Sequence, residues 1–299
     1  MSEEKPRLLI IGAGGFLGEH VSRAGRGTYE VFEADLAQPD GEKGLSVDIT
    51  SEASVRAVFD TARPQAAVLL AAISDIDQCE QRPELAETVN VRGVAHVATA
   101  CRRAGTRLVF TSSAAVFDGT RHGYREEDPP TPLSVYGKTK ARAEALIAAE
   151  LPDAPILRMA LVIGFAQAQN TNAMLNRFAA KLRAAERVVL PVFERRNPID
   201  AATLAQIMLR LLAGKDGGVF HAGAAESISR YELGVRLAER MGYPSKLVEP
   251  QTDPAPGRAP RGLDHFLISE RVMAACRMRM PSCDEVIDRA IHGTTQSDT

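Results

Sequence analysis

Short apolar runs alternate with segments of helical character through the first 165 residues of the chain. The run at 7–11 is almost entirely apolar and leads into glycines, as expected of a strand that is buried on both faces of a parallel sheet. Further strands are predicted at 29–34, 45–48, 66–72, 107–111 and within 154–163, and helices at 16–23, 52–62, 83–104 and 136–150. This alternation predicts an α/β protein built on a doubly wound parallel sheet.

The pattern becomes less regular after Gly164. Helices are predicted at 172–186, 201–212, 229–241 and 282–292, with a short strand at 219–221 and a proline-rich loop at 250–260. We therefore expect a Rossmann domain that is formed by residues 1–165 together with a later segment at about 195–225. A smaller mixed α/β C-terminal lobe, formed by 166–194 and 226–299, would close over a substrate.

The composition of the 299-residue chain is that of an ordinary globular enzyme. Apolar residues make up 45% and charged residues 25%, and the formal net charge of −2 comes without a basic block, which argues against nucleic-acid binding. No apolar run approaches the length of a membrane span, and the acidic start does not resemble a signal peptide, so we expect a cytoplasmic protein. The four cysteines and six histidines show no metal-binding spacing, which predicts no metal site.

Three glycines follow the first predicted strand at a spacing of three residues. Gly12, Gly15 and Gly18 allow a tight turn, a close approach of the backbone to a pyrophosphate, and close packing of the next helix on the sheet. The residues between them, Phe16 and Leu17, would begin that helix, whose positive end would face the phosphates. Because the triplet joins a strand to a helix, it predicts dinucleotide binding rather than a glycine-rich turn without a role.

An acidic residue ends the second predicted strand. Asp35 lies twenty residues after Gly15, where a carboxylate can bind the hydroxyls of the adenosine ribose and repel a 2′-phosphate. This position favours NAD(H) without excluding NADP(H); the alternative is a turn residue at the end of a strand. Asp48 and Ile49, after the third strand, are expected to lie near the adenine.

Tyr136 and Lys140 are separated by one helical turn and would project from the same face of a helix. An ammonium group beside a phenol favours the phenolate and lowers the pKa of the tyrosine. A tyrosine of that kind can exchange a proton with a carbonyl or an alcohol. Taken alone, the spacing fits a surface pair equally well.

Together with Thr111-Ser112-Ser113 after a strand, these motifs resemble the extended short-chain dehydrogenase/reductase family over nearly the whole chain. Within that family, several segments are similar to the dTDP-4-dehydrorhamnose reductase branch. They are 71–72, 77–84, Asn90, 116–119, 126–129, 132–140 and 196–200.

The resemblance implies a role for each matching position. Ser113, with Ser112 as the alternative, would hydrogen-bond a substrate carbonyl, and Tyr136 would exchange a proton with it. Lys140 would hold the nicotinamide ribose and lower the pKa of Tyr136, while the nicotinamide exchanges a hydride with C4 of a sugar. Ala71 and Ala72 match the segment that lines the cofactor in this branch.

The resemblance leaves the reaction open, because Ala114 and Ala115 replace an acidic residue and a tyrosine that are usual in this branch. Reduction of a keto-sugar nucleotide is favoured, and an NAD-dependent 4-epimerase is the first alternative. Dehydration is the least favoured, since two alanines supply no acid. The second alternative is a non-catalytic, dinucleotide-binding regulatory subunit, as in the beta subunit of methionine adenosyltransferase, which this branch also resembles.

The substrate end is predicted from residue types that suit a pyrophosphate. Arginine forks match phosphate oxygens, and such residues gather late in the chain. The candidates for substrate binding are Arg196 and Arg258, with Arg195, Arg261, Asn172 and Asn197 as further possibilities. The resemblance also implies a homodimer, in which the helices at 83–104 and 136–150 would form a four-helix interface.

Overall fold

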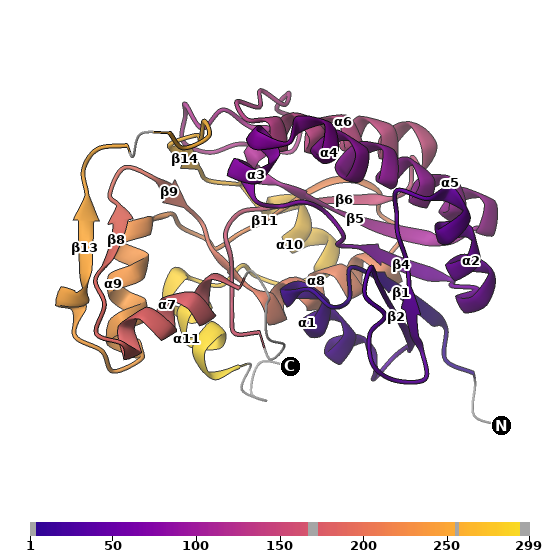
Figure 1. The fold of residues 1–299 in the computed structure, drawn as a ribbon, viewed down its shortest axis with the longest axis horizontal. Helices are drawn as coiled ribbons and strands as arrows, with labels where there is room; N and C mark the ends of the chain where they lie inside the picture. Colours follow the sequence, from indigo (N-terminus) through magenta and orange to yellow (C-terminus); the bar gives the residue numbers. More distant parts are fainter. Residues whose placement is uncertain (1–3, 167–172, 255–256, 294–299) are drawn as a thin grey trace.

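A seven-stranded parallel sheet forms the centre of the protein (Figure 1). The computed structural model describes residues 4–166, 173–254 and 257–293. The strands lie in the order β11-β6-β5-β4-β1-β2-β3, and each pairs in parallel with its neighbours. Their bounds are β1 (Arg7–Ile11), β2 (Glu30–Asp35), β3 (Gly44–Ser46), β4 (Ala66–Leu69), β5 (Arg107–Ser113), β6 (Pro155–Met159) and β11 (Gly218–Ala222). The predicted doubly wound α/β fold is confirmed.

Helices cover both faces of this sheet because successive residues of each buried strand point to opposite sides. Leu8 and Ile10 of β1 belong to one apolar cluster, while Leu9 and Ile11 belong to another. The first cluster is covered by α1 (Phe16–Gly25), α8 (Ala201–Ala213) and α10 (Glu270–Cys276). The second is covered by α2 (Glu52–Ala62), α5 (Val94–Ala104) and α6 (Val135–Glu150). In Figure 1, α1 and α8 lie below the sheet and α6 lies above it.

A smaller mixed part has its own apolar core and lies beyond one end of the sheet, on the left of Figure 1. Leu175, Leu237 and Ile287 are buried together there, one from each of its three helices. The helices are α7 (Met174–Arg183), α9 (Arg230–Arg240) and α11 (Cys283–His292). The short strands are β7 (Val162–Ile163), β8 (Val188–Pro191), β9 (Arg195–Arg196), β10 (Ile199–Asp200), β12 (Ile228–Ser229), β13 (Val248–Gln251) and β14 (Asp264–His265). They form three small sheets: β10-β7, β12-β9-β14 and β13-β8.

The chain departs from the predicted division at its C-terminal side. α10 lies within the range assigned to the smaller lobe, yet its residue Val272 packs in the core beneath the large sheet. In the segment at about 195–225, β11 and α8 extend and cover that sheet, whereas β9 and β10 belong to the small sheets. The loop predicted at 250–260 begins as the last residues of β13.

The single helix predicted at 83–104 is divided by a π-helical turn. α4 (Pro83–Glu87) leads into the π-helical segment η1 (Thr88–Gly93) and then into α5. A π turn accommodates one extra residue within a helix and is frequent at functional sites. Here it turns Asn90 inward, and Gly93 allows close packing, because a Cβ there would lie 2.8 Å from Cγ1 of Ile49.

Three further short elements were not predicted. They are the helix α3 (Ile76–Gln81) and the 3-10 turns η2 (Ala114–Val116) and η3 (Ser245–Leu247), and they add to α10 and the short strands β8, β9, β10, β12, β13 and β14, which the sequence pattern did not show either. Among the described residues, no helix combines the length and the apolar character that a membrane crossing requires.

Candidate active site

A cleft of about 800 Å³ runs from the end of β2 to the smaller part of the protein. It follows the carboxyl ends of the parallel strands, which is where open α/β sheets bind ligands. Fourteen predicted site residues line it: Gly12, Gly15, Phe16, Leu17, Gly18, Asp35, Asp48, Ile49, Ala71, Ala72, Ser113, Tyr136, Lys140 and Arg196. Arg258 is not among the lining residues, and Asn172 lies outside the described residues.

The glycine loop provides a backbone cradle at the first turn of α1. Gly12 has a φ of +95°, and a Cβ there would lie 2.6 Å from the backbone nitrogen of Ala71. A Cβ on Gly18 would lie 2.4 Å from the carbonyl oxygen of Ala13, so α1 packs against the loop with no room for a side chain. Among the described residues, no side chain caps α1 at Gly15. The free N–H groups and the positive end of the helix therefore fit the pyrophosphate of a dinucleotide.

Gly18→Ala is expected to weaken dinucleotide binding at least ~10-fold, because the added methyl must displace the Ala13 carbonyl and shift α1. Gly27→Ala is a matched control, since a Cβ on Gly27 meets no heavy atom within 4 Å. Titration calorimetry with NADH measures both. Equal affinities of Gly18→Ala and the wild type would show that this loop does not cradle the ligand.

Carboxylates occupy the end of the cleft beside the glycine loop. Asp35 accepts hydrogen bonds from the backbone N–H groups of Gly14 at 2.9 Å and Leu36 at 2.7 Å. Asp48 accepts hydrogen bonds from the backbone and the hydroxyl of Thr50. The cationic side chains that the structure places along the described cleft come instead from α6 and the smaller part. This end is therefore suited to the hydroxyls of a ribose rather than to a further phosphate.

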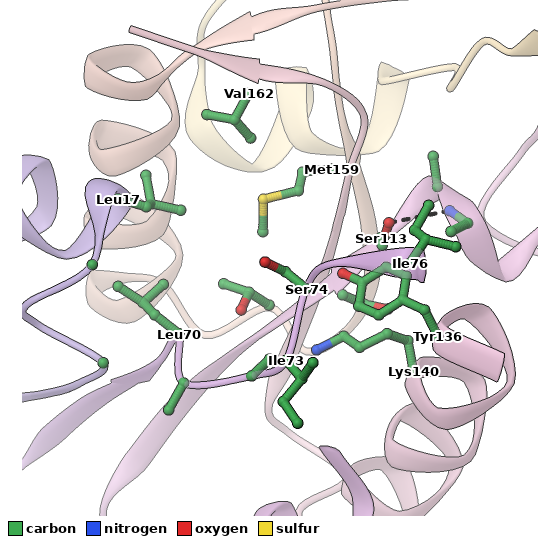
Figure 2. A pocket seen from close by; sticks show the side chains of 18 of the residues that line it. Leu17, Leu70, Ile73, Ser74, Ile76, Ser113, Tyr136, Lys140, Met159 and Val162 are labelled. Carbon is green, nitrogen blue, oxygen red and sulfur yellow. Dashed lines mark hydrogen bonds between the residues drawn. The ribbon is translucent and has the colours of Figure 1, made fainter. Parts of the chain in front are cut away.

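Ser113 and Tyr136 meet where β5 ends and α6 begins (Figure 2). The Ser113 hydroxyl oxygen accepts the backbone N–H of Ala115 at 3.2 Å, and Figure 2 shows this hydroxyl beside the phenol of Tyr136. Ser134 begins α6 by accepting the N–H of Gly137, and this fixes the first turn, which carries Tyr136. Two hydroxyls therefore face the cleft side by side.

Burial sets the charge state of the pair on α6. Burial raises the pKa of Tyr136 to about 12, against a smaller opposing effect of the nearby Ser113 hydroxyl. The expected lowering by Lys140 is not found. Lys140 is itself buried, which lowers its pKa to about 8, and its Nζ lies 4.3 Å from the centre of the Phe110 ring. Tyr136 is therefore a neutral phenol at neutral pH, and Figure 2 shows both side chains extending from α6 into the cleft.

A buried ion pair lies beneath these residues and was not predicted. Arg158 of β6 donates to both carboxylate oxygens of Glu144 on α6, with Nη2 at 2.7 Å and Nε at 3.0 Å. The Ser112 hydroxyl also donates to Glu144. Ser112 is therefore held by this pair, and Ser113 is the serine of the two whose hydroxyl lies beside Tyr136.

A backbone clamp holds the loop that follows β4. The side chain of Asn90, in the π-helical turn, accepts the N–H of Ile73 at 2.8 Å and donates to its carbonyl oxygen at 3.0 Å. The same amide donates to the hydroxyl of Thr139 on α6 at 3.2 Å. The loop that lines the cleft is thereby fixed to the helix that carries Tyr136 and Lys140.

Arg196 is held by the protein itself. Its guanidinium donates to the carbonyl oxygens of Arg195, Leu263 and Gly262 at 2.6, 3.1 and 3.0 Å, and burial lowers its pKa to about 10. It also lies 3.5 Å from Glu194. Three of its five N–H donors are thus already used by carbonyl oxygens, and its part in substrate binding stays a prediction.

The remaining predicted polar residues take different places. Arg258 lies 3.6 Å from Glu194, outside the cleft lining, and Arg195 donates to the Ser227 carbonyl oxygen at 2.8 Å. Asn197 is fully buried and donates to the carbonyl oxygens of Ala224 and Leu267, which makes it structural.

Two arginines line the cleft beside Arg196. Arg261 was considered from the sequence, whereas Arg230 was missed, because nothing in its surroundings along the chain marks it. Arg230 directly follows Ser229, which caps α9. Burial lowers the pKa of Arg230, the carboxylate of Glu194 in the same cleft opposes this, and the positive charges of Arg258 and Arg261 lower the pKa further. This concentration of positive charge suits an anionic group.

In the described ranges, no three His, Cys, Asp or Glu side chains are grouped to hold a metal ion.

Comparisons with known proteins agree with this geometry. The RmlD substrate binding domain family matches residues 6–295. A dTDP-4-dehydrorhamnose reductase from Aggregatibacter actinomycetemcomitans is 32% identical over 77% of this chain and 78% of its own. A methionine adenosyltransferase 2 subunit beta from Xenopus laevis is 29% identical over 85% of this chain and 78% of its own. The crystal structure of a dTDP-4-dehydrorhamnose reductase from Bacillus anthracis in complex with NADP superposes with a TM-score of 0.87, at 24% identity over 97% of this chain and 99% of its own.

Proposed function

Because the chain belongs to the RmlD substrate binding domain family, we propose that it is an NAD(P)-dependent oxidoreductase of the extended short-chain type. Its substrate would be a keto-sugar nucleotide, as the name of the reductase from Aggregatibacter actinomycetemcomitans implies for that relative. One observation carries the proposal. Ser113, Tyr136 and Lys140 meet in the same cleft as the glycine cradle, so a dinucleotide held there can reach a carbonyl group beside Tyr136.

Tyr136, Ser113 and Lys140 would each have a separate role in the reduction of a carbonyl group. A bound nicotinamide dinucleotide supplies the hydride that the carbonyl carbon receives. Tyr136 donates its phenolic proton to the carbonyl oxygen, and Ser113 donates a hydrogen bond to the same oxygen. The product is an alcohol, and Tyr136 takes a proton back from solvent. Lys140 would hold the nicotinamide ribose and stabilise the transient phenolate. Because burial raises its pKa, Tyr136 is protonated at neutral pH and carries the proton that reduction needs.

Arg230 and Arg261 are proposed to bind the diphosphate of the substrate, with Arg196 bracing the backbone beneath them. Arg258 and Asn172 remain predicted substrate ligands. Ala114 and Ala115 line the same cleft and leave an apolar surface close to Ser113. The sugar would therefore contact small apolar groups at this point, and the arginines would supply most of the charge recognition.

We propose NADH as the preferred cofactor, because the carboxylate of Asp35 would repel a 2′-phosphate. Asp35→Asn is expected to shift the ratio of the Kd values for NADPH and NADH by ~10-fold towards NADPH, as the charge is lost and a hydrogen-bond acceptor is kept. Fluorescence titrations with both dinucleotides measure this ratio. An unchanged ratio would mean that Asp35 serves only to hold the backbone of Gly14 and Leu36.

Two other functions give different results in one set of assays. A reductase consumes reduced dinucleotide in proportion to the keto-sugar nucleotide supplied. A 4-epimerase would interconvert sugar nucleotides with no net consumption. The similarity to methionine adenosyltransferase 2 subunit beta favours, as second candidate, a regulatory subunit, which would bind dinucleotide and a partner enzyme without turnover. Tyr136, Ser113 and Lys140 are all present, as catalysis requires, and this favours the reductase.

A further inference from the structure

We propose that Asp77 and Arg261 form a clasp that positions the catalytic helix α6 when the substrate loop, residues 257–263, engages its ligand. The inference rests on the proposed function of the same cleft. Asp77 lies on α3, which packs against α6, and Arg261 belongs to the substrate loop. Asp77 would be a positioning residue, because it acts through α6 rather than on the reacting atoms, and Arg261 would link it to the bound diphosphate.

A single carboxylate holds the loop at three points. Arg261 donates from Nη2 to Oδ2 of Asp77 at 2.7 Å and from Nη1 to Oδ1 at 3.1 Å. The backbone N–H of Ala259 donates to the same Oδ1 at 2.8 Å. The Arg261 guanidinium also donates to the Ala259 carbonyl oxygen at 3.0 Å, which closes the loop on itself. This bidentate geometry is typical of an arginine paired with a carboxylate.

The loop is attached to the smaller part of the protein on its other side. Arg196 donates to the carbonyl oxygens of Gly262 and Leu263, which directly follow Arg261. The substrate loop is thus tied to β9 through Arg196 and to α3 through Asp77. Pro260, Arg261 and Gly262 line the cleft, so the clasp bridges the two parts of the protein at the substrate end.

The same short helix also contacts the start of α6. Glu80 of α3 accepts the backbone N–H of Val135 at 2.7 Å, and Val135 directly precedes Tyr136. The Cys79 thiol donates to the carbonyl oxygen of Ile73, which fixes α3 to the loop after β4. A displacement of α3 would therefore move the first turn of α6, on which Tyr136 lies. The route from the substrate loop to the proton donor passes through one six-residue helix.

The clasp is expected to affect the position of Tyr136 more than the stability of the fold. The side chain of Asp77 is 41% exposed and that of Arg261 is 15% exposed. Ion pairs with such exposure contribute little to global stability. The clasp can still affect the rate of reaction strongly, because a small misplacement of a catalytic group such as Tyr136 lowers that rate.

Steady-state kinetics on the full chain test the clasp. Asp77→Asn is expected to lower kcat at least ~10-fold and to raise KM for the keto-sugar nucleotide, with an unchanged Kd for NADH. Asp77→Glu, which keeps the charge, is expected to restore most of kcat. Glu270→Gln, which removes the Arg125–Glu270 ion pair of 3.1 Å outside the cleft, is the matched control and is expected to behave as the wild type. A change in KM alone, or no recovery with Asp77→Glu, would overturn the coupling.

Limited trypsin digestion keeps this inference separate from the proposed function. Arg258 and Arg261 supply cleavage sites in the substrate loop, and Asp77→Asn is expected to be cut there several-fold faster than the wild type and Glu270→Gln. This result needs no turnover. Absence of keto-sugar reduction by the wild type would overturn the proposed function, whereas equal cleavage rates would overturn the clasp.

Discussion

Tyr136→Phe is expected to lower kcat at least ~100-fold while the Kd for NADH changes little. The substitution removes the phenolic oxygen alone, so the aromatic ring keeps its place on α6. Ser113 retains its hydrogen bond from the backbone N–H of Ala115 and remains in the cleft. The carbonyl oxygen then has a hydrogen-bond donor but no acid, and the alcohol forms only as fast as solvent supplies the proton.

The comparison needs a tyrosine outside the cleft as its control. Tyr243 packs at the edge of the core of the smaller part, and Tyr243→Phe is expected to leave kcat within a factor of ~2. Turnover with a keto-sugar nucleotide and titration with NADH are measured on both variants. Full activity of Tyr136→Phe would remove Tyr136 from the chemistry and would favour the regulatory role.

Arg158→Met is expected to lower the free energy of unfolding by about 3–5 kcal/mol, because it leaves the carboxylate of Glu144 buried without its cation. Glu144 and Arg158 are 5% and 3% exposed, so water cannot replace the lost partner. Arg158 also lies 5.0 Å from the centre of the Phe117 ring, a contact that methionine retains only in part. Burial is the largest cause that lowers the pKa of the neighbouring His221, and it remains in the variant, so it opposes compensation by this histidine.

The double variant Glu144→Gln/Arg158→Met tests whether charge is the cause. It removes both charges and keeps an amide oxygen that accepts the hydrogen bond of Ser112. At least half of the lost stability is expected to return, since a buried pair replaced by neutral groups is often tolerated. Urea denaturation measures all three proteins. A single variant as stable as the wild type would mean that the Glu144 carboxylate is not confined as the structure describes.

The large sheet could be predicted because each of its strands is marked by a local pattern of apolar residues in the sequence. Arg7–Ile11 and Ala66–Leu69 are short apolar runs, and each precedes a turn and a helix. The glycine triplet and the Tyr136/Lys140 pair are local in sequence as well, so their spacing could be interpreted without coordinates. Their convergence in one cleft followed from the sheet topology.

The substrate end could not be predicted to the same depth, because the partners of its residues are distant in sequence. The sequence alone does not show which groups the Arg196 guanidinium contacts, because its acceptors at Gly262 and Leu263 lie more than sixty residues away. The helix α3 has only six residues, most of them polar, and gives no periodic signal. The pKa of Tyr136 was predicted from the charge of Lys140, whereas burial, which depends on the whole fold, has the larger effect.

Hydride transfer to the sugar is the central claim, and isotope transfer tests it most directly. The wild-type protein is incubated with dTDP-4-dehydrorhamnose and NADH that carries deuterium at its transferable position, and the product is examined by mass spectrometry and NMR. One deuterium is expected at C4 of the product sugar for each NADH oxidised, and at least ~100-fold less deuterated product with Tyr136→Phe over the same time. A wild-type product without deuterium, or no product at all, would contradict it.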